Sequence, residues 1–268
     1  EVNENLKIIE RIGNLKKIKS SKSDENKPKI LIKANLKNKN IQENFNFELL
    51  KDEWAGIIGP SGSGKTTFMD IITGRTRPDS GKVEWGWPSR NLLKLSVSEI
   101  ARLGIGRKFQ RPTVFEDQTV KDNLILSLNK KRNPVSALFY IASEADLSKV
   151  EELSLEIGLE DSLNRIAGEL SHGQKQWLEI GMLLAQDPKL LLVDEPAAGM
   201  TLAERKHTTD LLKRTAGKHA VIVVEHDMDF IRRLNCRVTV LHEGAVLAEG
   251  SLDFVSRNRE VIEVYLGR

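Results

Sequence analysis

The sequence predicts an α/β fold in which a mostly parallel sheet carries helices on both faces. Residues 54–74 run from an apolar stretch through a glycine-rich turn into an amphipathic helix. After residue 171, apolar stretches at 189–194 and 220–225 alternate with helical stretches, a pattern typical of parallel α/β sheets. Residues 111–170 have the pattern of helices. We therefore expect a core sheet interrupted by a helical insertion at about residues 111–170.

Composition limits the classes of protein to consider. The 268 residues are 40% hydrophobic and 29% charged, with a formal net charge of +3. This small basic excess provides no electrostatic footprint for nucleic acid, so no nucleic-acid partner is expected. The longest clear apolar runs, residues 190–193 and 220–224, fall far short of the roughly 18 residues that a membrane helix needs. We therefore expect any membrane association to be peripheral.

The N-terminal part of the chain differs from the rest. Residues 1–14 carry enough aliphatic side chains for a short amphipathic helix, and residues 16–29 are rich in Lys, Ser and Asn. Such a polar stretch is typical of a mobile linker. We therefore expect residues 1–29 to form a flexible extension and residues 30–268 to form the folded domain.

The elements of the folded domain follow from periodicity, caps and glycine stops. Phe45, Phe47 and Leu49 alternate onto one face of a predicted strand, which belongs to an expected N-terminal antiparallel β-subdomain. Strands are expected at residues 30–32, 45–49, 55–58, 82–85, 104–110, 189–194, 220–225, 237–241 and 245–248. Helices are expected after the glycine-rich turn, at 98–103, from 119, and at 143–157, 174–184, 202–216 and 260–266.

Residues 59–66 match the pattern G-x-x-x-x-G-K-[ST] of a phosphate-binding loop. Its glycines let successive backbone N–H groups face an anion, Lys65 can reach the β- and γ-phosphates, and the Thr66 hydroxyl can ligate Mg²⁺. A flexible Gly/Ser linker is the alternative, but here strand, loop and helix follow in order. The predicted nucleotide-binding residues of this loop are Gly59, Pro60, Ser61, Gly62, Ser63, Gly64, Lys65, Thr66 and Thr67.

Two adjacent carboxylates end the apolar stretch at residues 190–193. In a parallel sheet they lie at the carboxyl edge, beside the phosphate loop. Because side chains alternate along a strand, Asp194 and Glu195 point in different directions. We expect Asp194 to join the Mg²⁺ shell and Glu195 to polarise a water for in-line attack on the γ-phosphate.

A second helix start offers another anion site. Ser171, Gly173 and Gln174 begin a predicted helix about a hundred residues after the first loop, although simple helix capping is the alternative. The chain thus has one nucleotide loop but two helix starts that can bind phosphate. This predicts that each nucleotide site is completed by the second helix start of another copy of the chain. We therefore expect two chains, related head to tail by a two-fold axis, each to cover the other's ATP.

Five segments together resemble an ATP-binding cassette (ABC) ATPase. Residues 59–67, Gln110, residues 170–174, residues 190–195 and His226 occur in the order and approximate spacing of that family. The resemblance implies a P-loop nucleoside triphosphatase (RecA-like) core. It also implies that Ser171 and Gly173 contact the γ-phosphate bound by the partner chain. Gln110 would join the Mg²⁺ shell and sense the membrane subunit, and His226 would contact the γ-phosphate.

The ending of the chain and three motif regions narrow the resemblance. Residues 171–184, 195–201, 224–230 and 261–268 are similar to ATP-binding subunits of bacterial importers for branched-chain amino acids and, most closely, for urea. This implies ATP and Mg²⁺ as cofactors and a homodimer or a heterodimer with a paralogous ATPase. It further implies transmembrane permease subunits, an extracytoplasmic solute-binding protein acting indirectly, and a place on the cytoplasmic face of the membrane.

Two parts of the family pattern lead to further expectations. An aromatic residue before the phosphate loop usually stacks on adenine in this family. Residues 31–44 contain none, which departs from the family pattern, and Phe45 is the fallback candidate. The segment from residue 109 to about 128 is the expected docking surface for the membrane subunits. The alternative for its apolar side chains is ordinary helical core. These side chains are Val114, Phe115, Val120, Leu124 and Ile125.

Three other functions remain alternatives. A non-transport ABC ATPase usually carries two cassettes or a long coiled-coil insertion, whereas residues 111–170 show no sustained heptads. An ATP-driven exporter of lipid or polysaccharide is a second alternative. A small P-loop kinase is a third, against which Glu195 and the second helix start argue.

Overall fold

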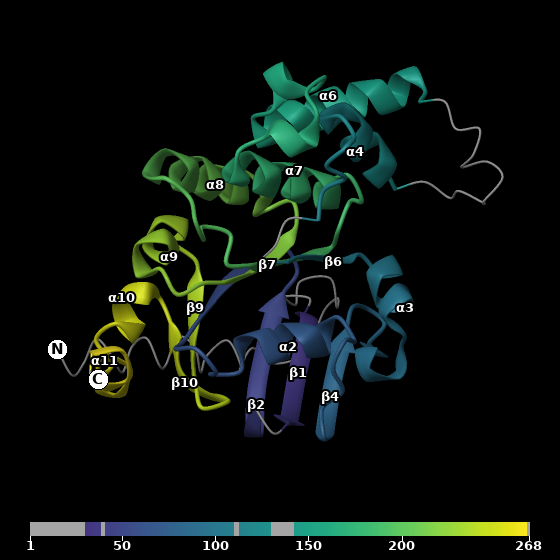
Figure 1. Ribbon diagram of the computed structural model, residues 1–268. Helices are drawn as coiled ribbons and strands as arrows, with labels where there is room; N and C mark the ends of the chain where they lie inside the picture. The colour runs from purple at the N-terminus through teal and green to yellow at the C-terminus, as the bar shows by residue number, and fades with distance from the viewer. Residues whose placement is uncertain (1–29, 39–40, 110–112, 130–141, 267–268) are drawn as a thin grey trace, which may run out of the picture.

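Two sheets and two groups of helices form the layers of the molecule (Figure 1). The computed structural model describes residues 30–38, 41–109, 113–129 and 142–266. The expected helix at residues 1–14, the expected linker at 16–29 and Gln110 lie outside these ranges.

A six-stranded sheet forms the centre, with strand order β10-β9-β3-β8-β7-β6. All neighbours pair in parallel except β10, which is antiparallel to β9. Both β7 and β8 are buried at every residue, as expected of parallel strands covered on both faces. The strands are β3 (Trp54–Ile58), β6 (Ile105–Lys108), β7 (Leu190–Asp194), β8 (Ala220–Val224), β9 (Arg237–His242) and β10 (Ala245–Gly250).

A second, four-stranded antiparallel sheet has the order β2-β1-β4-β5. Phe45, Phe47 and Leu49 are buried on one face of β2, which confirms the predicted alternation. The strands expected at 30–32 and 45–49 are longer than predicted, because pairing between β1 and β2 continues through their polar positions. The strands are β1 (Ile30–Asn38), β2 (Ile41–Leu50), β4 (Ser80–Trp85) and β5 (Arg90–Asn91).

Helix α2 (Lys65–Ile72) packs between the two sheets. Its Phe68 ring lies 4.9 Å from the Phe45 ring and 5.1 Å from the Phe47 ring, centroid to centroid. Leu190 and Leu192 of β7 belong to the same core. This layer fixes the start of α2, and with it the phosphate loop, against both sheets.

The opposite face of the six-stranded sheet carries most of the helices, through the alternate residues Leu191 and Val193. The helical insertion lies at the far end of this layer, where α4 and α6 pack on α7 (Figure 1). The helices are α3 (Val97–Arg102), α4 (Val120–Ser127), α6 (Glu144–Ile157), α7 (His172–Leu184), α8 (Leu202–Thr215), α9 (Met228–Leu234), α10 (Leu252–Val255) and α11 (Arg259–Leu266).

Two short helices were not expected from the sequence. The seven residues of α9 begin after Asp227, whose carboxylate accepts hydrogen bonds from the N–H groups of Asp229 and Phe230. They end at Asn235, which is in the left-handed conformation. Four residues form α10 after Ser251. Helices this short offer at most one or two turns of apolar pattern, so their caps are the clearest local signals.

Most of the apolar side chains in the expected docking segment are buried or partly buried. Val120 and Leu124 are fully buried, and Val114 and Ile125 pack partly buried against the same core. Only Phe115 of these five side chains is exposed, at 53%. The alternative of ordinary helical core is therefore confirmed for Val120 and Leu124, which hold α4 on the helical layer, and docking by the segment stays a prediction.

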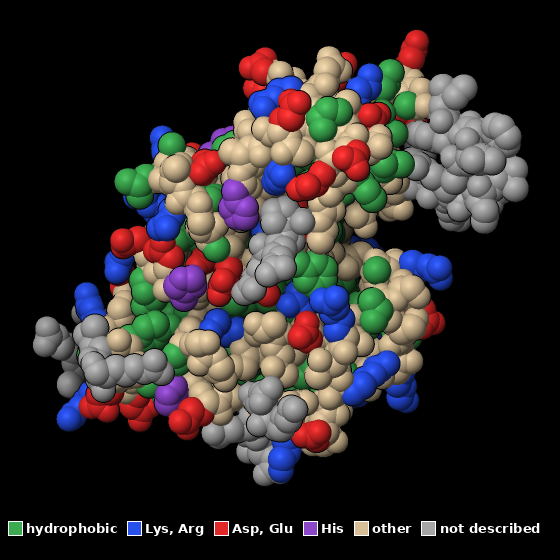
Figure 2. All heavy atoms as spheres, viewed as in Figure 1, with side chains coloured by type: hydrophobic (Ala, Val, Ile, Leu, Met, Phe, Trp, Pro, Cys, Tyr) green, Lys and Arg blue, Asp and Glu red, His purple; other side chains and the backbone are tan. Residues whose placement is uncertain are grey.

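The outer surface carries mixed charge. Acidic and basic side chains are interspersed on the face seen in Figure 2. Among the residues that the structure describes, no helix has the length and apolar character to cross a membrane.

The aromatic contact beneath the phosphate loop predicts a stability effect. Replacing Phe68 by alanine is expected to lower the free energy of unfolding by about 3–5 kcal/mol, because a fully buried ring leaves a cavity between the sheets. Urea denaturation measures this change. Phe254, which is 63% exposed, is the matched control, and Phe254→Ala is expected to change stability by no more than about 0.5 kcal/mol. Equal losses for the two variants would contradict the described packing.

Candidate functional site

The phosphate loop connects β3 to α2 at the carboxyl edge of the six-stranded sheet. Gly64 precedes the helix with a left-handed φ of 101°, a conformation that glycine adopts readily. A Cβ on Gly59 would lie 2.2 Å from the Leu241 carbonyl oxygen, so a larger residue does not fit there. The first N–H groups of α2 therefore face the loop as an anion site.

Lys65 lies at the centre of the loop and is buried. Its Nζ donates hydrogen bonds to the carbonyl oxygens of Gly59 and Pro60, both at 2.8 Å. Burial lowers the pKa of Lys65, and the nearby Glu195 and Asp194 carboxylates oppose this shift. The amine is thus held by neutral groups at the place where a phosphate would supply the opposite charge.

Asp194 ends β7 beneath the loop. Its Oδ2 accepts a hydrogen bond from Arg107 at 3.1 Å, and Arg107 also pairs with Asp70 of α2. Burial raises the pKa of Asp194, and Arg107 opposes the shift. Within the described residues, the buried Oδ1 of Asp194 has no hydrogen-bond partner.

This orphaned oxygen fits a Mg²⁺ ion with its water shell, since carboxylate oxygens are ligands that Mg²⁺ prefers. Thr66 and Asp194 would hold the ion; Gln110, the third predicted ligand, lies outside the described residues. When bound, Mg²⁺ neutralises charge on the phosphates.

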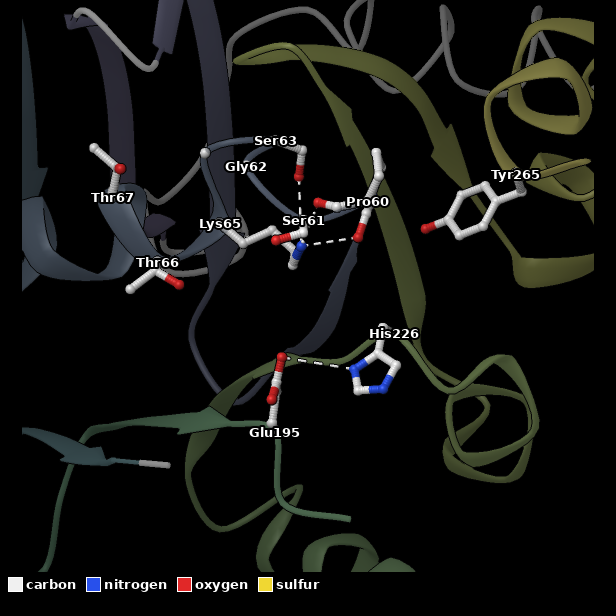
Figure 3. Close-up of a pocket in the computed structure, with 12 residues that line it drawn as sticks. Pro60, Ser61, Gly62, Ser63, Lys65, Thr66, Thr67, Glu195, His226 and Tyr265 are labelled. Carbon is white, nitrogen blue, oxygen red and sulfur yellow. Dashed lines mark hydrogen bonds and ion pairs between the residues drawn. The ribbon is translucent and has the colours of Figure 1, made fainter. Parts of the chain in front are cut away.

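Glu195 follows directly and points into the cavity rather than into the core (Figure 3). Its N–H still bonds the Val224 carbonyl at 2.9 Å, but its φ of 45° is left-handed. Such a conformation costs a non-glycine residue on the order of 1–3 kcal/mol and is common at functional sites. The Nδ1 atom of His226 lies 3.6 Å from Glu195 Oε1.

Glu225 was missed by sequence reasoning. It is 1% exposed, and its Oε1 accepts a hydrogen bond from the Ala197 N–H at 3.0 Å. Its Oε2 accepts from the N–H groups of His226 at 3.0 Å and Asp227 at 3.2 Å. Burial raises the pKa of Glu225, and these N–H donors oppose it. This carboxylate ties the loop after Glu195 to the loop that carries His226. The sequence feature that could have revealed Glu225 is its position as a carboxylate at the end of an apolar strand.

The loop, Glu195 and His226 line one cavity of about 580 Å³ (Figure 3), within the range of about 300–1,000 Å³ for small-molecule sites. Of the predicted residues, the structure brings together Gly59, Pro60, Ser61, Gly62, Ser63, Gly64, Lys65, Thr66, Thr67, Glu195 and His226. Tyr265 of α11 also lines it, although no motif in the sequence predicts a role for this residue.

Ser171, Gly173 and Gln174 do not line this cavity. The Ser171 and Gln174 side chains form a capping box at the start of α7. A Cβ on Gly173 would lie 2.5 Å from Glu204 Oε1, so a side chain would collide there. Local capping explains this geometry within one chain, and a role toward a second chain's nucleotide stays a prediction.

Phe45 does not fit the role expected for it. The side chain is 2% exposed and packs against Phe68. A base cannot stack on a ring that is covered in this way, so the prediction that Phe45 stacks on adenine is wrong.

Comparison with known proteins agrees with this geometry. Residues 42–198 match the family model described as ABC transporter, and residues 245–268 match that described as branched-chain amino acid ATP-binding cassette transporter. The chain is 33% identical to the high-affinity branched-chain amino acid transport ATP-binding protein LivG of Escherichia coli K12, over 84% of this chain and 91% of LivG. It is 31% identical to BraF of Pseudomonas aeruginosa, over 83% and 90%.

Solved structures show the same architecture. The ADP conformation of MJ1267, an ATP-binding cassette of an ABC transporter, matches with a TM-score of 0.75 and 28% identity, covering 89% of this chain and 99% of that one. A dimeric post-hydrolysis cassette, MJ0796 bound to ADP and Pi, matches with a TM-score of 0.70 and 26% identity, covering 83% and 99%. These matches confirm the predicted α/β nucleotide-binding fold. The chain belongs to the ABC transporter family, as one of its ATP-binding, ATP-hydrolysing subunits.

Proposed function

We propose that this ATPase drives the uptake of branched-chain amino acids, hydrolysing Mg²⁺-bound ATP at the cavity between the phosphate loop and Glu195. The observation that carries the catalytic part is the convergence of Lys65, Glu195 and His226 on one cavity. The names of the relatives LivG and BraF and the match of residues 245–268 support the solute class.

The position of each residue indicates its proposed role in ATP binding or hydrolysis. Backbone N–H groups of the loop and Lys65 bind the β- and γ-phosphates, and Thr66 and Asp194 would hold Mg²⁺. Glu195 orients and polarises the attacking water as a general base. His226, 3.6 Å from Glu195, contacts the γ-phosphate, and Gln110 would be a further Mg²⁺ ligand.

The working unit is a dimer, with either a second copy or a paralogous ATPase. Ser171, Gly173 and Gln174 of each chain then close on the γ-phosphate held by the other chain. The dimeric state of the cassette MJ0796 supports this arrangement. The dimer acts on transmembrane permease subunits from the cytoplasmic face, and a solute-binding protein delivers the solute on the other side.

Urea is the competing solute. The sequence motifs predict a resemblance to the urea importer's subunit, whereas the relatives described above are named for branched-chain amino acids. The cassette does not touch the solute, so the choice between the two needs a measurement of uptake.

Glu195→Gln tests the catalytic base. ATP binding is expected to persist, while ATP turnover falls by roughly 10²–10⁴-fold, because the amide cannot take a proton from water. Phosphate release under saturating ATP measures the rate. Glu152→Gln, on the exposed face of α6, is the matched control and is expected to retain the full rate. Near-normal hydrolysis by Glu195→Gln would refute the assignment.

Lys65→Met tests the phosphate contact. Loss of this preorganised charge is expected to lower ATP turnover by about 10²-fold or more and to weaken ATP binding. Lys82→Met removes a lysine whose side chain is 58% exposed and is expected to change neither quantity. If Lys65→Met keeps wild-type turnover, the phosphates do not bind at this loop.

Uptake by cells tests the solute class. In a strain lacking this gene, uptake of radiolabelled leucine, isoleucine and valine is expected to fall, and the wild-type gene restores it. The Lys65→Met gene does not, because restoration requires ATP turnover. Loss of urea uptake with normal leucine uptake would replace the proposed solute by urea.

A further inference from the structure

Helix α11 brings a phenolic side chain to the nucleotide cavity. Val261, one turn earlier, is 2% exposed and anchors the helix in the core. Tyr265 packs partly buried against the same core, and its ring lines the cavity together with the phosphate loop, Glu195 and His226. A residue from the far end of the chain thus forms part of the wall around the predicted phosphates.

The hydroxyl of Tyr265 lacks a protein partner. Its oxygen is buried, and no group in the described part of the chain forms a hydrogen bond with it. Buried hydroxyl groups are nearly always paired, so an unpaired one calls for a ligand or water. Burial also raises the pKa of Tyr265 to about 12, so at neutral pH the group keeps its proton and can donate a hydrogen bond.

The direction of the Tyr265 side chain indicates which end of the nucleotide it faces. Figure 3 shows the hydroxyl pointing toward the Pro60 side of the loop, with His226 nearby. Thr66 and Thr67, where α2 starts, lie on the other side of the same view. His226 and Glu195 face the position of the terminal phosphate in the proposed function, so Tyr265 lies on that side too.

We propose that Tyr265 is a nucleotide-binding residue whose hydroxyl donates a hydrogen bond to the terminal phosphate of ATP. This inference rests on the proposed binding of ATP at the phosphate loop. Phosphate oxygens at neutral pH are strong acceptors and match a neutral donor. Because ADP lacks the terminal phosphate, the contact forms with ATP alone. The C-terminal helix therefore helps the chain to distinguish ATP from ADP.

Tyr265→Phe tests this contact, because it removes the hydroxyl and keeps the ring. Dissociation constants for the non-hydrolysable β,γ-imido analogue of ATP and for ADP are measured by calorimetry, each with Mg²⁺. Loss of a hydrogen bond to a charged group is expected to weaken binding of the analogue about 10-fold or more, with ADP binding unchanged. Trp87→Phe, which changes an aromatic side chain that is 84% exposed and does not line the cavity, is the control and is expected to change neither constant.

Thermal unfolding without nucleotide separates this effect from a folding defect. Removing an unpaired buried hydroxyl is expected to leave the midpoint unchanged or to raise it. A lowered midpoint together with equal weakening for both nucleotides would overturn the proposal, as would unchanged binding of the analogue. A defect seen only at concentrations where the chains dimerise would also overturn it, since the hydroxyl would then contact the second chain. If the wild-type chain itself failed to bind the analogue, the proposed function would fail instead.

Discussion

The parallel pairing of β3, β8 and β7 is the constraint on which the site depends. In this register Ile57 pairs with Val224, and Val224 pairs with Asp194. The three strands therefore end at the same level of the sheet, and their next residues are the phosphate loop, Glu225 and Glu195. Segments separated by more than a hundred residues in the sequence meet there without any long side chain having to bridge them. The site is thus built from strand ends, as expected for an open α/β sheet.

Buried charged groups surround this edge, and ion pairs or backbone hydrogen bonds compensate them. Arg107 of β6 joins Asp194 of β7 to Asp70 of α2. Glu225 receives three backbone N–H groups instead of a cation. Removing one partner of such a group leaves an uncompensated buried charge, which destabilises a protein strongly. The Glu225 hydrogen bonds join the loop after Glu195 to the loop that carries His226, so the stability of this edge and the geometry of the cavity depend on the same contacts.

The sequence predicted the α/β class, both sheets and most helices. Continuous apolar runs indicated buried strands such as β7, and helical periodicity indicated helices such as α2. It also identified the loop, Glu195 and His226, since contiguous motifs carry them. It missed Glu225 and Tyr265, whose importance comes from tertiary contacts that no local pattern records. The prediction for Phe45 is wrong for the same reason. Its place before the loop suggested a residue that stacks on the base, but packing on Phe68 buries the ring. The expected closeness to the urea importer has no support among the relatives compared, and it stays a prediction.

A crystal structure with Mg²⁺ and the β,γ-imido analogue of ATP tests the central claim most directly. We expect the phosphates to lie within the phosphate loop, with the terminal phosphorus between the Lys65 amine and the Glu195 carboxylate. We also expect the first residues of a second chain's α7 to cover the terminal phosphate. A nucleotide bound elsewhere, or a Glu195 carboxylate directed away from the terminal phosphate, would contradict it.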